Sequence, residues 1–174
     1  MIEIGGPLRL GNSPSVEGHT KLLFVLPSLG GGGAERASVT SLQTQFADVA
    51  GVTVALFAKD GTFLRQVPEN VHVHDIQGGQ RYDLRLVFRL AGLVRREMPG
   101  VIFSVLRYGN LVTLLARRVA RSQAKVVVNE QNLPSAEFAL FGGARIKGWF
   151  LIRLYPQADL VTSISKGIAR ELAT

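Results

Sequence analysis

The sequence predicts an α/β domain built on a doubly wound, mainly parallel β-sheet. From residue 21 onward, short apolar segments alternate with longer segments of helical periodicity. The apolar segments are nearly continuous, which is typical of parallel strands buried on both faces of a sheet. Hydrophobic residues make up 47% of the 174-residue chain, so a sizeable core can form.

The expected elements follow one another in regular order. Strands are expected at residues 22–26, 52–58, 71–76, 101–105, 125–128 and 160–162. Helices are expected at residues 34–46, 84–96 and 110–120, with a last helix starting near residue 165. The second helix has an apolar stripe on one face and several arginines on the other. Strands that alternate with helices are joined by right-handed crossovers, so the expected architecture is Rossmann-like.

The first twenty residues differ in composition from the rest of the chain. They are rich in Gly, Pro and Ser, and they lack the charged start and apolar centre of a signal peptide. We therefore expect a flexible N-terminal extension over residues 1–20 and one domain over residues 21–174. No apolar run reaches the roughly 18–20 residues that a membrane-spanning helix needs.

The formal net charge of +7 favours anionic partners, namely phosphorylated substrates, an anionic membrane leaflet or nucleic acid. Nucleic acid ranks last, because the sequence holds no recognised DNA- or RNA-reading motif. The absence of cysteine excludes disulfides, thiolate metal sites and a cysteine nucleophile. The histidines His19, His72 and His74 form no convincing metal set, so neither a metal nor a cofactor is expected.

The strongest local signal is the run of four glycines, Gly30–Gly33, between the first strand and the first helix. Glycine lets the backbone approach a ligand closely, and a helix N-terminus offers free N–H groups and a positive dipole end. The spacing does not fit G-x-G-x-x-G/A, since Glu35 or Arg36 falls at the third position, and no P-loop lysine follows. The turn is therefore predicted to bind phosphate or sugar hydroxyls, with an ordinary tight turn as the alternative.

Further candidate residues lie at other carboxyl ends of the expected strands, where ligands bind in such sheets. Arg107 and Tyr108 suit a phosphorylated or sugar ligand, the alternative being a solvated arginine and a helix capped by Asn110. Glu130 is expected either to accept hydrogen bonds from sugar hydroxyls or to pair with a nearby arginine. Ser165 is first of all a good helix N-cap.

Six segments resemble, in order, sequence elements of the retaining, GT-B-fold glycosyltransferases of family 4. The first segment, 21–36, includes the glycine turn. The other five are 54–57, 68–75, 96–104, 126–132 and 158–169. The last of them, Ala-Asp-Leu-Val-Thr-Ser-Ile-Ser-Lys-Gly-Ile-Ala, resembles the family signature A-D-x-x-v-x-v-S-x-x-x-A. The resemblance covers essentially residues 21–174.

The resemblance implies that the chain is the N-terminal, acceptor-binding half of a glycosyltransferase. Such an enzyme moves a hexose from a nucleotide-diphospho-sugar to a saccharide or polyprenyl-linked acceptor, and the configuration at the anomeric carbon is retained. In that fold a second domain binds most of the donor and carries a Glu-x7-Glu element. No two glutamates stand eight positions apart in this sequence. We therefore expect the donor-binding domain to be absent and the chain alone to be inactive. The alternative is a non-catalytic sugar- or nucleotide-binding Rossmann-like module.

The resemblance also assigns roles to individual residues. Gly31, Gly32 and Gly33 match the loop that lies under the donor diphosphate and beside the acceptor hydroxyl. The acceptor side is expected to include Arg107, Tyr108, Glu130, Gln131, Asn132 and Ser165. Gln131 stands where many members carry His or Arg, and glutamine can only form hydrogen bonds, so general-base catalysis from this position is not expected. The catalytic residue stays unassigned.

Residues 133–155 combine aromatic and aliphatic side chains with basic ones. The residues expected to contact a membrane are Arg145, Lys147, Trp149, Phe150 and Arg153. Alternatively, the apolar side of this segment packs on the sheet or on the second domain. The arginines around helix 84–96 are either a solvated face or a further source of affinity for an anionic membrane. The resemblance implies cell-surface polysaccharide or glycolipid synthesis and a cytoplasmic location, peripheral at the inner face of the cytoplasmic membrane.

Overall fold

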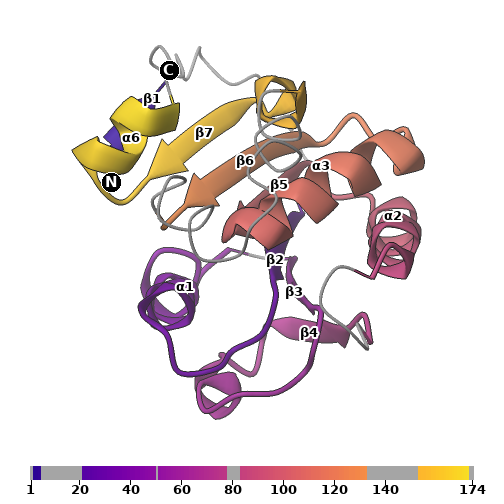
Figure 1. The fold of residues 1–174 in the computed structure, drawn as a ribbon. Coiled ribbons are helices and arrows are strands. Elements are labelled where there is room, and N and C mark those ends of the chain that lie inside the picture. Colours follow the sequence, from indigo (N-terminus) through magenta and orange to yellow (C-terminus); the bar gives the residue numbers. More distant parts are fainter. Residues whose placement is uncertain (1, 5–20, 50, 78–82, 133–152, 173–174) are drawn as a thin grey trace.

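The computed structural model describes residues 2–4, 21–49, 51–77, 83–132 and 153–172. These residues form a seven-stranded sheet in the order β1-β7-β6-β5-β2-β3-β4 (Figure 1). The strands are β1 (Ile2–Ile4), β2 (Leu22–Leu26), β3 (Val52–Leu56), β4 (His72–Asp75), β5 (Val101–Val105), β6 (Lys125–Glu130) and β7 (Leu160–Ser163). All pairs among β2 to β7 are parallel, and β1 pairs with β7 in the antiparallel direction. The prediction of a mainly parallel sheet is confirmed.

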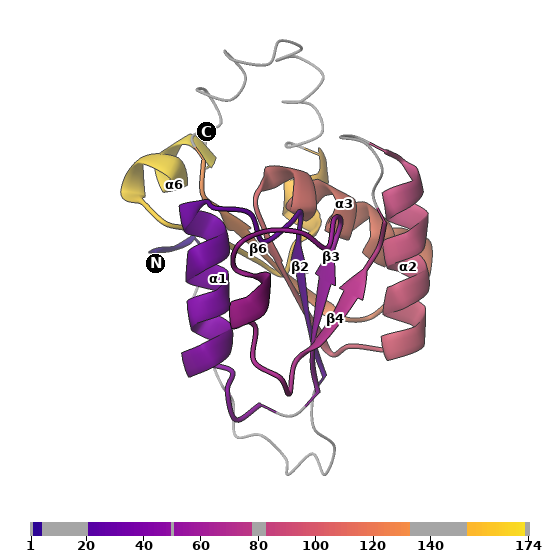
Figure 2. The same cartoon turned by 90° about the horizontal axis from the view of Figure 1, so that it is seen from below.

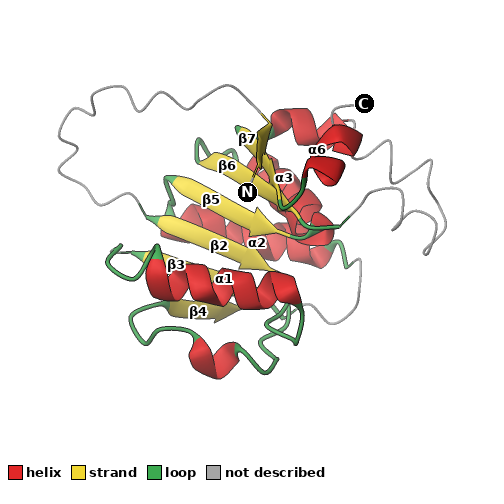
Figure 3. Ribbon diagram, turned by 90° about the vertical axis from the view of Figure 1, so that its left-hand side faces the viewer, coloured by secondary structure: helices red, strands yellow, loops and turns green. Residues whose placement is uncertain are grey.

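Helices cover both faces of this sheet. The α-helices are α1 (Gly33–Thr44), α2 (Arg85–Glu97), α3 (Arg107–Ala120) and α6 (Lys166–Leu172), and the 3-10 helices are η1 (Leu64–Gln66) and η2 (Tyr155–Gln157). Helix α1 lies on one face of the strands, and α2 and α3 lie together on the other (Figures 2 and 3). The doubly wound architecture is therefore confirmed. None of the helices in the described ranges is long and apolar enough to cross a bilayer.

The central strand β2 shows why its continuous apolar sequence was a reliable signal. Leu23 and Val25 point to the core beneath α2 and α3, whereas Leu22, Phe24 and Leu26 point to the core beneath α1. All five side chains are buried. Because both faces of the strand are covered, every position must be apolar, and no polar alternation remains in the sequence.

Helix α2 forms because its apolar residues fall on one face. Leu86, Leu90, Leu93 and Val94 are buried, and they pack into the core shared with α3. The helix ends at Met98, which has a left-handed backbone conformation (φ 48°), and Pro99 follows directly. The expected boundaries 84–96 differ from the observed ones by a single residue at each end.

Two differences from the expected boundaries affect the architecture. Residues 2–4 of the expected extension form strand β1, in register with β7 from Ile2 opposite Ser163 to Ile4 opposite Val161. Residues 5–20 lie outside the described part of the chain. Helix α3 begins at Arg107 and not at Asn110, because Leu106 turns the chain sharply with φ 67° and ψ 143°. The helix consequently starts immediately after β5, with no intervening loop.

The strand order fixes where a ligand site is expected. From β2 the chain proceeds outward through β3 and β4, and then returns to the other side of β2 to form β5, β6 and β7. The switch point therefore lies between β2 and β5, where open α/β sheets bind their ligands at the carboxyl ends of the strands. Residues 27–33 follow β2 and residues 106–110 follow β5, so both segments lie at this point.

Candidate active site

The glycine turn lies between the end of β2 and the start of α1, as the sequence predicted. Gly32 is the N-cap of α1 and provides no side-chain hydrogen bond to the first turn. Gly31, Gly32 and Gly33 are exposed. Gly32 has no side chain with which to cap the helix, so the N-cap residue leaves the first N–H groups open, and the positive end of the helix dipole points the same way.

The fold itself does not require glycine at two positions of this turn. A Cβ atom added to Gly31 or Gly33 would meet no described atom within 4 Å. Among the described glycines, the left-handed backbone conformation occurs at Gly51 and Gly61, not in the turn. At Gly32 a Cβ would meet only the flexible carboxylate of Glu35. Close approach of a ligand to the backbone at Gly31 and Gly33 therefore stays a prediction.

A second loop holds the glycine turn in place, and its role was not predicted. Gly61 has φ 117°, and a Cβ there would lie 1.9 Å from the carbonyl oxygen of Leu29. The backbone N–H of Leu29 donates to the backbone carbonyl of Asp60 (3.0 Å), and the Thr62 hydroxyl donates to the carbonyl of Gly30 (2.7 Å). The loop after β3 thus supports the loop after β2, and here glycine is required by the fold.

The first turn of α3 forms the other side of the switch point. Gly109 faces the end of β2, with its Cβ position 3.7 Å from Pro27. Tyr108 packs edge-on against Phe57, with 5.4 Å between the ring centroids. Leu106 combines a positive φ with a bulky side chain, a strained state that usually costs about 1–3 kcal/mol. The strain is located at the carboxyl end of β5, beside the glycine turn.

Arg107 and Glu130 form a buried ion pair at this end of the sheet. Arg107 Nε lies 3.2 Å from Glu130 Oε2, and the two side chains are 6% and 0% exposed. Arg107 Nη2 also donates to the backbone carbonyl of Asn132 (3.3 Å). Of the two expected roles of Glu130, the structure therefore shows pairing with an arginine. Direct ligand contacts by Arg107, Tyr108 and Glu130 stay predictions.

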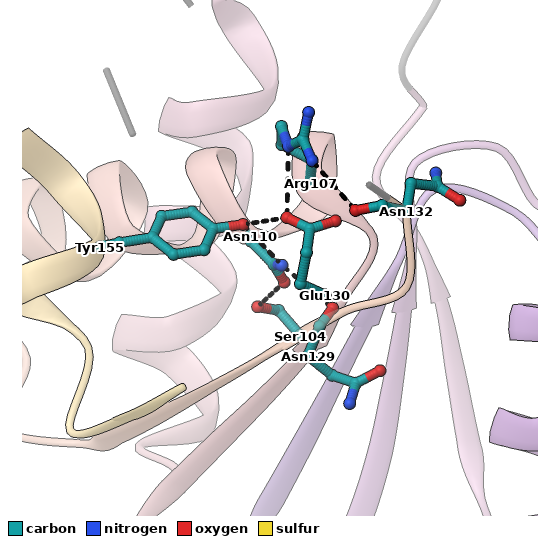
Figure 4. A network of polar contacts seen from close by, with 7 residues as sticks. All are labelled: Ser104, Arg107, Asn110, Asn129, Glu130, Asn132 and Tyr155. Atoms are coloured by element: carbon teal, nitrogen blue, oxygen red, sulfur yellow. Dashed lines mark hydrogen bonds and ion pairs between the residues drawn. The ribbon is translucent and has the colours of Figure 1, made fainter. Parts of the chain in front are cut away.

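The ion pair belongs to a larger polar network (Figure 4). The Tyr155 hydroxyl donates to Glu130 Oε2 (2.6 Å) and accepts a hydrogen bond from Asn110 Nδ2 (3.1 Å). Asn110 Oδ1 in turn accepts from the Ser104 hydroxyl (2.7 Å). Asn110 is therefore not a helix cap, as one alternative had it, but a buried link between β5, β6 and η2.

Sequence reasoning missed three members of this network, namely Ser104, Asn129 and Tyr155. Asn129 donates from Nδ2 to the Thr162 hydroxyl (2.8 Å), which joins β6 to β7. The sequence did indicate Ser104 and Asn129, because each is a polar residue inside a buried strand and must find a hydrogen-bond partner. Tyr155 gave no such signal, since it was counted among the aromatic residues of segment 133–155.

Burial controls the protonation of the network. Burial raises the pKa of Glu130 above its ordinary value, although the Arg107 charge and the Tyr155 hydrogen bond oppose this shift. Burial also raises the pKa of Tyr155 well above its ordinary value, and the Glu130 carboxylate adds to the effect. Tyr155 therefore remains a hydrogen-bond donor at neutral pH. Because Glu130 balances the charge of Arg107, the N-terminus of α1 is the better candidate for holding an anion.

The remaining predicted residues are partly placed by the structure. Gln131 donates from Nε2 to Asn129 Oδ1 (2.9 Å), and the Asn132 side chain is exposed. Ser165 accepts a hydrogen bond from the N–H of Ile168 (3.2 Å), so its capping role at α6 is confirmed, while acceptor binding stays a prediction. Arg153 is exposed. The other expected membrane contacts, Arg145, Lys147, Trp149 and Phe150, lie outside the described residues.

The described residues contain no group of three or more His, Cys, Asp and Glu side chains arranged to hold a metal ion. His72 and His74 lie on the edge strand β4, with their ring centroids 4.4 Å apart. His74 also lies 3.6 Å from Glu97. Burial and the neighbouring His72 lower the pKa of His74. His19 lies outside the described ranges.

Comparison with known proteins agrees with this geometry. The sequence model of the Glycosyl transferase 4-like domain matches residues 32–174, from the glycine turn through the last helix. The chain belongs to this family. The predicted family 4 resemblance is confirmed, and the chain is a glycosyltransferase-type domain. No curated protein sequence matches it.

Two solved structures have a similar fold. One is Alr3699/HepE of Anabaena, in complex with UDP and glucose. Its TM-score is 0.63, its sequence identity is 23%, and the match covers 89% of the 174-residue chain. The other is the lipopolysaccharide outer core galactosyltransferase WaaB in its apo form, with a TM-score of 0.63 and 12% identity over 88% of the domain. The domain spans 41% and 42% of the lengths of those two structures.

Proposed function

We propose that this domain is the acceptor-binding half of a hexosyltransferase that uses a nucleotide-diphospho-sugar donor. The observation that carries the proposal is the glycine turn at the switch point, because Gly31 and Gly33 leave open backbone that the fold itself does not need. Membership of the glycosyl transferase 4-like family supplies the reaction class. A related fold with bound UDP and glucose, HepE, supports a nucleotide-sugar as the donor.

The mechanism assigns an electrostatic role to this turn. As the bond between the sugar and the diphosphate breaks, negative charge develops on the leaving phosphate. Preorganised backbone N–H groups at the start of α1 stabilise such charge in a water-poor site. A second domain binds the rest of the donor, and the acceptor lies against the ends of β5 and β6. Gln131 and Asn132 contact acceptor hydroxyls, and no cofactor takes part.

The proposed setting is synthesis of a cell-surface polysaccharide or glycolipid. The acceptor is a saccharide or a polyprenyl-linked saccharide, presented at the inner face of the cytoplasmic membrane. In that setting, segment 133–155 brings aromatic and basic side chains to the lipid surface. The similarity in fold to WaaB, a lipopolysaccharide galactosyltransferase, is consistent with such an acceptor.

A donor screen tests the proposal. The 174-residue chain and the longest natural polypeptide that contains it are each incubated with a panel of nucleotide-diphospho-hexoses and with saccharide and lipid-linked acceptors. Mass spectrometry detects the product, and NMR reports its anomeric configuration. We expect donor-dependent transfer with retention by the longer polypeptide and none by the 174-residue chain. Turnover by the chain alone would refute its predicted inactivity, and no transfer by either would favour a non-catalytic binding module.

A further inference from the structure

Three polar side chains form a hydrogen-bonded row at the carboxyl ends of β6 and β7. Asn129 and Thr162 lie opposite each other in the parallel register, and each is 3% exposed. The Thr162 hydroxyl donates to the backbone carbonyl of Val128 (3.2 Å) and accepts from Asn129 Nδ2 (2.8 Å). Asn129 Oδ1 accepts from Gln131 Nε2 (2.9 Å). The row therefore leads from a buried backbone carbonyl to the partly exposed amide of Gln131.

The carbonyl of Val128 sets the direction of every bond in this row. A carbonyl oxygen can only accept, so the Thr162 hydroxyl donates to it and must then accept from its other neighbour. Asn129 consequently turns its NH2 group to Thr162 and its oxygen to Gln131. Gln131 meets that oxygen with its own NH2 group, which leaves its Oε1 at the open end of the row. Within the described residues, no hydrogen bond to this oxygen is observed.

The row lies on the face of the sheet that carries α1 and the glycine turn. Val105 contributes to the core beneath α1, and Asn129 is its partner in the register of β5 and β6, so both side chains point to that face. The side chain of Asn129 accordingly points away from Glu130 and its network (Figure 4). Neighbouring strands are about 4.8 Å apart, so the ends of β2 and β6 lie roughly 10 Å apart. A phosphate at the glycine turn and a sugar at Gln131 can therefore be bound side by side.

Holding β6 to β7 does not require polar groups on this face. Two residues earlier on the same face, Val127 stands opposite Leu160, and this pair is apolar. A buried polar row is a less tolerant solution, because every group in it must be hydrogen-bonded. The polar groups occur just where β6 ends and Gln131 follows. A role in orienting Gln131 accounts for this position.

We propose that Thr162 and Asn129 are positioning residues that make Gln131 a hydrogen-bond acceptor for a hydroxyl group of the acceptor sugar. A hydroxyl can donate to Gln131 Oε1, whereas an ionised phosphate or carboxylate oxygen only accepts and fits this oxygen less well. The inference rests on the proposed function, because the ligand that it describes is the acceptor of the transfer. It places a hydroxyl at Gln131 and leaves the anion to the N-terminus of α1.

NMR of the 174-residue chain tests the direction of the row without any ligand. In the wild-type chain we expect a scalar coupling across the hydrogen bond from Gln131 Nε2 to the side-chain carbonyl carbon of Asn129. Thr162→Val keeps the shape of the side chain and removes the hydroxyl, so Asn129 is free to turn over. We expect the coupling to disappear and solvent exchange of the Gln131 amide protons to accelerate about fivefold. Thr162→Ser keeps the hydroxyl and is expected to retain both signals.

The matched control makes the same substitution at another buried threonine. Thr113 is 1% exposed and lies in α3, and its hydroxyl has no hydrogen-bond partner in the described part of the chain. Thr113→Val therefore removes a buried hydroxyl without touching the row. We expect this variant to show the wild-type coupling and wild-type kinetics.

Kinetics of the longest natural polypeptide test what the oriented amide recognises. The donor and acceptor identified by the donor screen are used, together with acceptor analogues in which one hydroxyl at a time is replaced by fluorine, which cannot donate. We expect Thr162→Val to raise the KM for the acceptor about fivefold, while kcat and the KM for the donor stay at wild-type values. One fluorinated analogue is expected to raise the same KM in wild type and to have little further effect in Thr162→Val. A purely structural role of Thr162 would not produce this selective loss.

The inference is overturned if Gln131 Nε2 shows no coupling to Asn129 in the wild-type chain, a measurement that does not depend on any variant folding. It is also overturned if folded Thr162→Val retains the wild-type KM for the acceptor, or if Thr113→Val raises that KM equally. Absence of transfer in the donor screen refutes the proposed function, and the NMR result then decides on the positioning row by itself.

Discussion

The Arg107–Glu130 ion pair is the most constrained pair of residues in the candidate site. Both side chains are buried, and the pair links the first turn of α3 to the end of β6. A buried charge is tolerated only while its partner remains, so each residue depends on the other. Tyr155 adds a short hydrogen bond to the same carboxylate and so ties η2 to this point.

A double-mutant cycle tests this dependence. Glu130→Gln leaves the Arg107 guanidinium without its buried carboxylate, and we expect a loss of about 3–5 kcal/mol in the free energy of unfolding. Arg107→Met combined with Glu130→Gln removes both charges, and we expect most of that loss to be recovered. Urea unfolding followed by circular dichroism measures both values, and that of Arg107→Met alone, which closes the cycle. If the losses of the single variants simply add in the double variant, the two side chains do not act as a pair.

At the scale of elements, Asp159 links the start of β7 to strand β6 and helix α3. Its Oδ2 accepts a hydrogen bond from the N–H of Val126 in β6 (2.9 Å) and lies 3.2 Å from Arg117 of α3. Its Oδ1 lies 2.9 Å from Lys125 Nζ. Burial alone would raise the pKa of Asp159, but the Val126 and Lys125 hydrogen bonds and the Arg117 charge outweigh it and lower the pKa.

This shift predicts a pH-dependent contribution to stability. A carboxyl with a lowered pKa stabilises the fold above its unfolded pKa of about 3.9, and that contribution disappears as pH falls through the folded value. We expect Asp159→Asn to lower the free energy of unfolding by about 1–2 kcal/mol at pH 7. As pH falls through the lowered folded pKa, the variant and wild type are expected to converge. A difference that stays constant as pH falls from 7 to below that pKa would show that ionisation of Asp159 contributes nothing.

The sequence predicted the strands well because their burial leaves a local signal. β2 and β5 matched their expected ranges, since a strand between two helical layers must be apolar along its length. The start of α3 was misplaced by three residues, because nothing local marks the positive φ of Leu106. The buried state of Asn110 depends on Tyr155, forty-five positions away, so the network could not be predicted from local pattern.

For the site, the expected ligand contacts stay predictions, and the structure adds the geometry of the residues concerned. The four glycines indicated close backbone approach, and the structure leaves open space at Gly31 and Gly33. Arg107 pairs with Glu130 and donates to the Asn132 carbonyl, which its charge alone did not predict, and its expected contact with a ligand stays a prediction. The support given by Gly61 was also missed, because the contact with Leu29 joins two different loops.

At the scale of the whole molecule, the candidate site lies at one end of the parallel sheet. The carboxyl ends of β2 and β5 hold the glycine turn and the polar network, where the proposed transfer takes place. The chain spans about two fifths of the length of the solved structures that share its fold.

The most direct test of the central claim, that the glycine turn contacts substrate, is hexose transfer by the longest natural polypeptide carrying Gly31→Ala or Gly33→Ala. Open space around both positions predicts an unchanged thermal midpoint. Gly61→Ala serves as the contrast, because its backbone conformation and its clash with Leu29 predict a loss of at least about 2 kcal/mol in stability. We expect transfer by the Gly31 and Gly33 variants to fall about a hundredfold, since a methyl group displaces the diphosphate by about 1 Å. Transfer at the wild-type rate by both variants would contradict the claim.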